Sequence, residues 1–158
     1  MTTVDDSLYF DQADLPQPAE LVDLARVASE LCSVPISLVS IVESDRVRFL
    51  ASVGTTWEEV SLEHSFCTHT VQQQGLLVVE DAAQDVRFAS NPYVSGEGGV
   101  RFYAGIPITS PEGLPVFTLC VIDVVPRTLK TTQYEALAQI HGWMVDTLVL
   151  EQTPERVH

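Results

Sequence analysis

The chain has 158 residues, which suits one domain with a continuous apolar core and leaves too little for two domains of ordinary size. Hydrophobic residues make up 46% and charged residues 19%, the balance of a folded globular protein rather than of a disordered one. Eight lysines and arginines stand against 22 aspartates and glutamates, and the net charge of -14 argues against nucleic acid or an anionic membrane as a partner.

Residues 1–17 are predicted to form a flexible acidic arm, because they are polar, lack a sustained hydrophobic period and end in a Leu-Pro-Gln-Pro stretch. Acidic residues stand where a signal peptide needs positive charge followed by an apolar run. No segment has the apolar length of a membrane span. We therefore expect a cytoplasmic protein whose domain begins at residue 18.

The first regular element is predicted to be a helix that begins near residue 18 and is bounded downstream by Pro35. Its apolar residues recur at helical spacing and are Leu21, Leu24, Ala25, Ala28 and Leu31. Residues 36–42 and 47–53 follow, rich in β-branched side chains and separated by a polar turn. These two segments are expected to pair as an antiparallel hairpin.

The middle of the chain is predicted to contain only short elements. The polar stretch 54–63 is assigned no element, and Ser65 is an acceptable N-cap for a short helix that ends near Gly75. A short buried strand over 76–79 comes next. Residues 80–100 contain so many turn formers that we expect a long loop there.

The last third is predicted to contain a second hairpin and a closing helix. The strand-like segments 101–108 and 114–124 flank a turn that is rich in proline and glycine. Thr132 and Glu135 form a capping-box pattern that opens the helix. Between 143 and 150 this helix is apolar on almost all sides, so a second surface is expected to cover it.

This order of elements predicts an α+β fold, in which an antiparallel sheet is covered by helices on one face. A doubly wound fold is excluded because the sequence has no βαβ unit and no phosphate-cradling glycine motif. The sequence also lacks internal repeats and low-complexity tracts.

The cysteines and their neighbours are the first candidates for chemistry. Cys32, Cys67 and Cys120 are odd in number and widely spaced, which favours reduced thiols over a disulfide framework. Cys67 and His69 point about 200° apart on a helix, so we expect neither a metal site nor a catalytic pair. Cys67 is interpreted as a small buried apolar residue. His69 and its neighbour Thr70 belong either to the edge of the core or to a ligand cleft.

One face of the last strand carries Thr118, Cys120 and Ile122, while Phe117 lies on the other face. The first face either fills a core or borders a cavity, and a reactive Cys120 would need a base that sequence does not place. Charged residues expected to anchor the long loop by hydrogen bonds are Asp81, Asp85, Arg87 and Arg101. Aromatic residues that either pin this loop to the core or line a pocket are Phe88, Tyr93, Phe102 and Tyr103.

Four sequence blocks resemble the GAF domain family and occur in the order of that family. They are Ser65-Phe-Cys-Thr-His-Thr70, Val79-Glu-Asp-Ala82 through Arg87-Phe-Ala-Ser-Asn-Pro92, Arg101-Phe-Tyr-Ala-Gly-Ile-Pro107 and Thr118-Leu-Cys-Val-Ile-Asp123. The subgroup that they resemble is often found ahead of diguanylate cyclase or histidine kinase modules. The resemblance implies a sensory domain over residues 18–152, with a short tail over 153–158.

The resemblance further implies a central antiparallel sheet with the terminal helices on one face. A ligand cleft, covered by the short helix and the long loop, is implied on the other face. Carried over by position, the residues expected to line this cleft are Phe66, Cys67, His69, Thr70, Asp81, Phe88, Asn91, Arg101, Tyr103, Thr118 and Cys120.

The function implied by the resemblance is detection of a small molecule in signal transduction, without catalysis, cofactor or metal. GAF domains of this kind commonly dimerise through their first and last helices, and the apolar excess near the end of the closing helix suits such a homodimer. Residues expected in this interface are Leu21, Leu24, Ala28, Trp143, Val145 and Val149. Because no output module follows the closing helix, the signal is expected to pass to a separate protein.

Two alternatives stay open. The first is a ligand-free dimerisation or interaction module, because Phe117 stands where many relatives have glycine and its bulk would partly fill the cleft, and because no effector domain is expected after the closing helix. The second is a thiol enzyme of the free methionine sulfoxide reductase type, in which Cys67 and Cys120 would approach each other across the cleft. A covalent bilin is not expected, since Thr68 rather than histidine follows Cys67.

Overall fold

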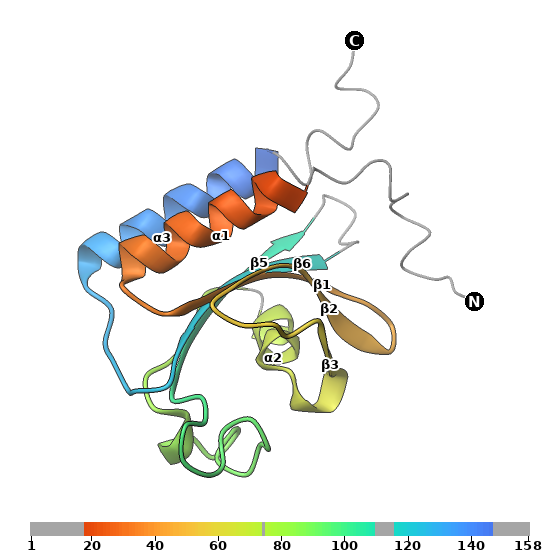
Figure 1. The fold of residues 1–158 in the computed structure, drawn as a ribbon, viewed down its shortest axis with the longest axis vertical. Coiled ribbons are helices and arrows are strands. Elements are labelled where there is room, and N and C mark those ends of the chain that lie inside the picture. The colour runs from red at the N-terminus through yellow and green to blue at the C-terminus, as the bar shows by residue number, and fades with distance from the viewer. Residues whose placement is uncertain (1–17, 74, 110–115, 147–158) are drawn as a thin grey trace.

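The computed structural model describes residues 18–73, 75–109 and 116–146. In these ranges one antiparallel sheet of six strands, in the order β3-β2-β1-β6-β5-β4, is packed against helices on both faces (Figure 1). The strands are β1 Ile36–Val42, β2 Arg46–Val53, β3 Glu59–Ser61, β4 Leu77–Val79, β5 Phe102–Thr109 and β6 Val116–Asp123. The helices are α1 Pro18–Cys32, α2 Phe66–Gln73 and α3 Thr131–Met144, with single 3-10 turns at η3 Leu62–His64 and η4 Ala82–Gln84.

The helices α1 and α3 lie side by side on one face of the sheet, whereas α2 and the long loop cover the opposite face (Figure 1). This arrangement confirms the predicted α+β fold with its terminal helices on a single face. We call these two sides of the sheet the helix face and the cleft face. None of the helices in the described part of the chain has the length and apolar character needed to cross a membrane.

The helix α1 forms because its apolar side chains recur every three or four residues and therefore share one side of the helix. Leu21, Ala25 and Ala28 are almost fully buried against the sheet. The helix ends where Ser33 adopts a left-handed conformation with φ of 57°. The backbone N–H of Val34 then donates to the carbonyl of Ser29 at 3.0 Å, which satisfies one of the last helical carbonyls.

The central strands β1 and β6 pair directly, with Leu38 opposite Cys120 and Ser40 opposite Thr118. Because successive side chains of a strand point to opposite faces, these strands supply both sides of the sheet. The apolar core of the helix face includes Val39, Ile41, Phe117, Leu119, Val121, Leu137, Ile140 and Met144. The apolar core of the cleft face includes Leu38, Phe66, Cys67, Phe88, Tyr103, Cys120 and Ile122.

Two local predictions are wrong. The stretch 54–63, expected to lack a regular element, contains the edge strand β3, whose three residues pair with the start of β2. So short a strand has no alternating pattern that sequence could show. The Thr132–Glu135 capping box is also absent, because α3 begins at Thr131 and the side-chain oxygen of Gln133 accepts the backbone N–H of Lys130 at 2.8 Å.

Several predictions lie outside the described residues. They concern the acidic arm over 1–17, the turn of the second hairpin, the end of the closing helix beyond residue 146 and the tail over 153–158. The limits of the predicted sensory domain, 18 and 152, therefore stay predictions.

Candidate functional site

The short helix α2 carries a cysteine to the centre of the cleft face. The hydroxyl oxygen of Ser65 accepts the backbone N–H of Cys67 at 3.0 Å, which caps the first turn of the helix. Phe66, Cys67 and Thr70 then point toward the sheet and are all buried. A one-turn spacing on α2 therefore delivers an aromatic ring, a thiol and a hydroxyl group to the same side of the sheet.

The hydroxyl groups of β1 and β6 meet the Cys67 sulfur. Thr118 donates a hydrogen bond from Oγ1 to Sγ of Cys67 at 3.1 Å, and Oγ of Ser40 lies 3.4 Å from the same sulfur. Ser40 and Thr118 also hydrogen-bond to each other across the strand pair. All three side chains are inaccessible to solvent or nearly so. The two strands thus present a polar surface to α2 at one point of an otherwise apolar core.

Tyr103 of β5 extends this polar cluster. Its hydroxyl group lies 3.7 Å from Sγ of Cys67 and 2.7 Å from Oγ1 of Thr70. Thr70 in turn lies 3.3 Å from the carbonyl oxygen of Phe66. Every polar atom of the cluster has a partner, as burial demands. Cys67 is therefore buried as predicted, but it is not the isolated apolar residue that we expected.

The pKa values of the two cleft thiols are driven apart. The pKa of Cys67 falls from 9.0 to about 6, chiefly because the Cys120 thiol donates a hydrogen bond to it, with further help from Ser40 and Thr118 and against the effect of burial. The same hydrogen bond, together with burial, raises the pKa of Cys120 well above 9.0. Burial also raises the pKa of Tyr103. At neutral pH the cluster thus holds one thiolate beside one thiol.

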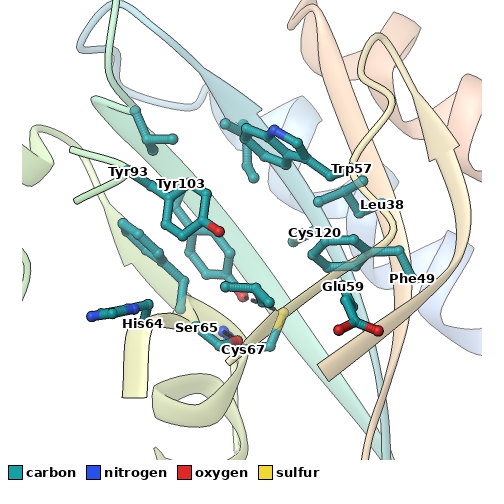
Figure 2. A pocket seen from close by; sticks show the side chains of 14 residues that line it. Leu38, Phe49, Trp57, Glu59, His64, Ser65, Cys67, Tyr93, Tyr103 and Cys120 are labelled. Atoms are coloured by element: carbon teal, nitrogen blue, oxygen red, sulfur yellow. Dashed lines mark hydrogen bonds between the residues drawn. The ribbon is translucent and has the colours of Figure 1, made fainter. Parts of the chain in front are cut away.

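A cavity of about 40 Å³ opens beside Cys67 (Figure 2). The residues that line it come from the sheet, η3, α2 and the long loop, and are Leu38, Phe49, Trp57, Glu59, Val60, His64, Ser65, Phe66, Cys67, Tyr93, Val100, Tyr103, Cys120 and Ile122. Apolar and aromatic groups dominate, so the cavity suits a small ligand with few polar atoms.

Aromatic rings organise the cavity and its surroundings. Trp57 and Tyr93 meet edge to face with ring centroids 5.8 Å apart, and Tyr93 is 39% exposed. Deeper in the cleft, Phe66 stacks on Phe88 at 4.2 Å. Such contacts add about 0.5–1.5 kcal/mol each to the burial of the rings. The rigid stack supports the inner wall, whereas Trp57 and the half-exposed Tyr93 occupy the outer part.

The long loop is fastened to the cleft by polar contacts. The guanidinium of Arg101 donates to the carbonyls of Val94 at 2.6 Å and Gly96 at 2.9 Å. The side-chain amide of Asn91 donates to the carbonyl of His64 at 2.9 Å, which joins the loop to η3. Asp81 accepts the backbone N–H of Ala83 at 3.2 Å and so caps η4. These contacts confirm that charged side chains anchor the loop, and they hold Tyr93 at the cavity.

The structure sorts the predicted cleft residues into three groups. Those that line the cavity are Phe66, Cys67, Tyr103 and Cys120. Thr70 and Thr118 lie behind the cavity in the hydrogen-bonded cluster. Those that do not border it are His69, Asp81, Phe88, Asn91 and Arg101. His69 instead packs edge to face against Phe88, with ring centroids 4.8 Å apart. Ligand binding by any of these residues stays a prediction.

Sequence reasoning missed much of the outer wall. Lining residues that no prediction placed at a cavity include Leu38, Phe49, Trp57, Glu59, Val60, His64 and Val100, whereas Tyr93 and Ile122 had been named as candidates for a pocket wall. Strand alternation could have found Leu38, because it lies two residues before Ser40 on β1. Trp57 could also have been found, because a single aromatic residue in a polar stretch is a candidate for a buried or ligand-facing position. Glu59 had none, and its carboxylate pairs with Arg46 at 2.8 Å.

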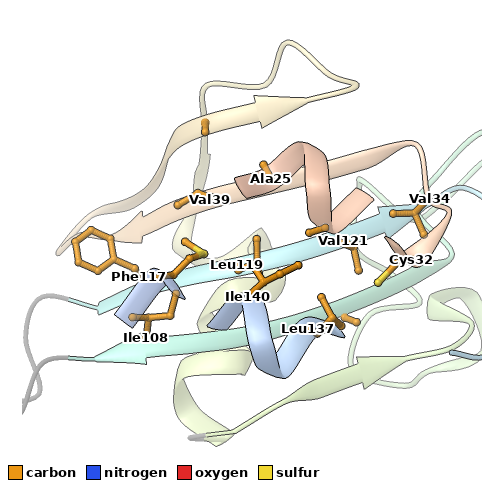
Figure 3. Close-up of a cluster of buried hydrophobic side chains, with 14 of the residues drawn as sticks. Ala25, Cys32, Val34, Val39, Ile108, Phe117, Leu119, Val121, Leu137 and Ile140 are labelled. Carbon is orange, nitrogen blue, oxygen red and sulfur yellow. The ribbon is translucent and has the colours of Figure 1, made fainter. Parts of the chain in front are cut away.

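The expectation that Phe117 would fill the cleft is wrong. Phe117 lies on the helix face, fully buried and near Ile108 and Leu119 (Figure 3). Its neighbour Thr118 points to the cleft instead, because side chains alternate along β6. The bulk of Phe117 therefore takes no space from the cavity, which removes one of the two observations behind a ligand-free module.

The predicted dimer interface stays a prediction, and the single chain shows how exposed its residues are. Leu21 and Ala28 are 2% and 0% exposed in the core of the helix face, so they have no surface to offer a partner. Trp143 is 46% exposed on α3, and Leu24 and Val145 are partly buried at the edge of that core. Val149 lies outside the described residues.

Among the described residues, no group of three or more His, Cys, Asp or Glu side chains is placed to hold a metal ion.

Comparison with known proteins gives two kinds of match. The family model of the GAF domain matches residues 20–140. A cyclic di-GMP phosphodiesterase of Pseudomonas aeruginosa is 41% identical over 122 residues, which cover 75% of this chain and 21% of that protein. The chain thus spans about a fifth of the length of this curated relative.

Solved structures match at lower identity and show the fold alone. The GAF domain of an Acinetobacter phosphoenolpyruvate-protein phosphotransferase has a TM-score of 0.67 at 17% identity, covering 82% of this chain and 80% of that one. The free methionine-R-sulfoxide reductase of Neisseria meningitidis, solved with its substrate, has a TM-score of 0.67 at 16% identity, covering 90% and 82%. The reduced form of the corresponding Staphylococcus aureus protein has a TM-score of 0.68 at 15% identity, covering 91% and 90%.

Proposed function

This chain belongs to the GAF domain family, and we propose that it is a cytoplasmic sensory domain that binds a small molecule beside Cys67 and acts in signal transduction. The observation that carries the proposal is the cavity on the cleft face, which brings aromatic rings, two thiols and Tyr103 together. The match to part of a cyclic di-GMP phosphodiesterase supports a role in signalling. In this proposal the domain binds its ligand without turning it over.

The cavity defines the kind of ligand. Its volume of about 40 Å³ admits only a few heavy atoms unless Trp57 or Tyr93 moves aside. The carboxylate of Glu59 already pairs with Arg46, and the Cys67 thiolate is held by the hydroxyl groups of Thr118 and Ser40, so neither anion needs a charged ligand as its partner. Burying an unpaired charge against apolar walls is costly. These features favour a small, uncharged ligand that offers an apolar or flat surface to the aromatic rings.

Polar contacts connect strands β6 and β5, which supply residues to the cleft, to the helices α1 and α3 on the other face of the sheet. At one end, Arg127 pairs with Asp123 of β6 at 2.5 Å and donates to the carbonyl of Cys32, the last residue of α1, at 3.3 Å. At β5, the ring Nε2 of His141 on α3 lies 3.1 Å from the carbonyl of Pro107. A ligand that shifts the strands would therefore displace both helices. The ligand can shift the equilibrium between two arrangements of the strands and helices only to the extent that it binds one arrangement more tightly than the other.

The signal would leave through the outer surface of α1 and α3. Trp143 is 46% exposed on α3, and Leu24 and Val145 are partly buried apolar residues that pack against the core of the helix face. We propose that this surface forms a homodimer and transmits the liganded state to a separate signalling protein. Apolar residues at the edge of two adjacent helices suit an interface of this type.

Ligand binding is tested with the two tryptophans of the chain, Trp57 at the cavity and Trp143 on α3. The Trp143→Phe variant leaves Trp57 as the sole indole reporter, and Trp57→Phe is the matched control. We expect pools of small uncharged metabolites to change the fluorescence of Trp143→Phe and not that of Trp57→Phe. Native mass spectrometry followed by denaturation then identifies any molecule that the protein retains and reports the oligomeric state.

Either of two results would contradict the proposal. One is an unchanged Trp57 signal with every metabolite pool together with no retained mass. The other is a response of equal size in the Trp57→Phe control, which would place binding away from the cavity.

A further inference from the structure

Cys67 and Cys120 differ from the third cysteine in having each other as neighbours. Both line the cavity and belong to the same buried cluster. Cys120 follows Thr118 by two residues on β6 and so shares its face of the sheet, and Thr118 contacts the Cys67 sulfur at 3.1 Å. Cys32 lies in the core on the opposite face of the sheet. We propose that Cys67 and Cys120 form a redox-active pair: a small hydroperoxide oxidises Cys67, and Cys120 then closes a disulfide that joins α2 to β6. The inference rests on the cavity of the proposed function but requires no other ligand.

The surroundings of Cys67 favour its anion. A thiolate accepts several hydrogen bonds, whereas a neutral thiol donates only one. Here the hydroxyl groups of Thr118, Ser40 and Tyr103 lie at 3.1, 3.4 and 3.7 Å from the sulfur, from three different strands of one sheet. With a pKa of about 6, Cys67 is mostly deprotonated at pH 7. Since the thiolate is the form that attacks peroxides, Cys67 is the first of the two to react.

Cys120 is suited to the second step. Its pKa is raised well above 9.0, so it keeps its proton while Cys67 reacts. Its position on the same wall of the cavity suits it to attack an oxidised Cys67. The attacking form is the thiolate, so the Cys120 proton must pass to the sulfenic oxygen of Cys67 as that oxygen leaves.

The size of the cavity selects the oxidant. Cys67 and Cys120 are only 3% and 1% exposed, so any oxidant must reach them through the cavity that both residues border. Trp57 and Tyr93 lie at the outer part of this small cavity. Hydrogen peroxide, with only two oxygen atoms, is the smallest hydroperoxide and has the least bulk to bring past these rings. A hydroperoxide with a branched alkyl group is bulkier and should therefore reach the thiols more slowly.

The chemistry balances without another reactant. The Cys67 thiolate attacks one oxygen of hydrogen peroxide, an S–O bond forms, the O–O bond breaks, and the departing hydroxide takes a proton to become water. The Cys120 sulfur then attacks the sulfur of the Cys67 sulfenic acid while its proton passes to the sulfenic oxygen, the S–S bond forms, the S–O bond breaks, and that oxygen leaves as a second water. The two thiols supply the two electrons, and one peroxide is reduced to two waters.

The test uses the full chain with Cys32→Ser, which removes the one cysteine outside the pair. Hydrogen peroxide is added, and free thiols and intact mass are measured after denaturation. We expect the loss of both thiols, a mass lower by two hydrogens, and a peptide that links Cys67 to Cys120. In Cys32→Ser/Cys120→Ser, a sulfenic acid at Cys67 should be trapped by a dimedone probe. In Cys32→Ser/Cys67→Ser, Cys120 should stay reduced at the same exposure.

Controls separate this inference from its alternatives. In wild type, Cys67 should be oxidised roughly a hundredfold faster than Cys32, because their thiolate fractions differ so widely. tert-Butyl hydroperoxide should react more slowly than hydrogen peroxide with the Cys32→Ser protein. Thr118→Val, combined with Cys32→Ser, should slow oxidation while leaving Cys67 in place, which covers the case in which a Cys67 variant does not fold.

Two outcomes would overturn the inference: a Cys67 that stays reduced while added free cysteine is consumed, or a Cys32 that is oxidised as fast as Cys67. Because the assay contains no metabolite, these outcomes are independent of ligand binding. If the protein forms the disulfide but its Trp57 fluorescence never changes with any metabolite pool, the proposed ligand binding is contradicted and the redox pair is still supported.

Discussion

The helix face and the cleft face are built from alternate residues of the same strands, yet their chemistry differs. On β6, Phe117, Leu119 and Val121 join an apolar core with α1 and α3 (Figure 3). Between them, Thr118 donates a hydrogen bond to Cys67, and Cys120 lines the cavity beside Cys67 (Figure 2). One sheet therefore combines a packed face that supplies stability with a polar face that supplies the candidate site.

Two buried cysteines show what the difference means. Burial among apolar side chains raises the pKa of Cys32 from 9.0 to about 11, although Arg127 opposes the shift. Cys67 is also buried, yet hydrogen bonds from Cys120, Ser40 and Thr118 lower its pKa to about 6. Burial alone makes a thiol inert, whereas burial beside hydrogen-bond donors makes it reactive.

The largest effect is expected on the helix face. Phe117→Ala removes a fully buried ring and should lower the free energy of unfolding by about 3–5 kcal/mol, as a cavity in a packed core does. Denaturant unfolding measures this loss. The pKa of Cys67 should stay near its wild-type value in this variant, since Phe117 lies on the other face. A strongly shifted Cys67 would mean that the two faces are not separable.

A smaller loss is expected from the polar cluster. Thr118→Val keeps the shape of the side chain but removes the donor to Cys67 and the hydrogen bond to Ser40. We expect the free energy of unfolding to fall by about 1–3 kcal/mol. The pKa of Cys67 should rise because its thiolate loses a donor. Val121→Ala on the helix face is the contrasting variant, which should lower stability without moving that pKa.

The two faces should also respond oppositely to pH. Cys67 titrates at about 6 in the folded protein and near 9.0 when unfolded, so the unfolded chain binds more protons between these values. The free energy of unfolding should therefore rise with pH from about 6 to 9, and Cys67→Ser should reduce this slope. Cys32 has the opposite effect on stability, because its pKa is higher in the folded protein than in the unfolded chain. Its contribution to the free energy of unfolding is lost as pH rises from 9.0 to about 11. Urea unfolding at several pH values would reveal both trends.

The smallest effect is expected where neither face is involved. Val86 in the long loop is 94% exposed, so Val86→Ser should change the free energy of unfolding by no more than about 0.5 kcal/mol. Thermal unfolding compared with wild type measures it. A loss above this size would show that the loop contacts a surface absent from the single chain.

The sequence predicts some features of the two faces and not others. Strand alternation places Thr118 and Cys120 together and Phe117 opposite them, so the sequence already contained the correction to the idea that Phe117 fills the cleft. Helical spacing likewise identifies the buried side of α1, to which Leu21 belongs. What sequence does not supply is the position of one element relative to another.

The outer wall of the cavity illustrates that limit. Glu59 reaches the cavity because a three-residue strand pairs with β2, a long-range contact that leaves no periodic signal. His69 was placed in the cleft by resemblance, but the rotation of α2 about its axis turns Cys67 to the sheet and leaves His69 against Phe88. Such rotations are set by packing across the whole core, which local pattern does not encode.

The most direct test of the contrast between the faces is the rate at which each cysteine of the native protein is alkylated as a function of pH. Mass spectrometry of the peptides resolves Cys32, Cys67 and Cys120 in one experiment. The structure predicts that Cys67 reacts first, with an inflection near pH 6, while Cys32 stays protected until the protein unfolds. An inflection for Cys67 near 9.0, or alkylation of Cys32 at an equal rate, would contradict it.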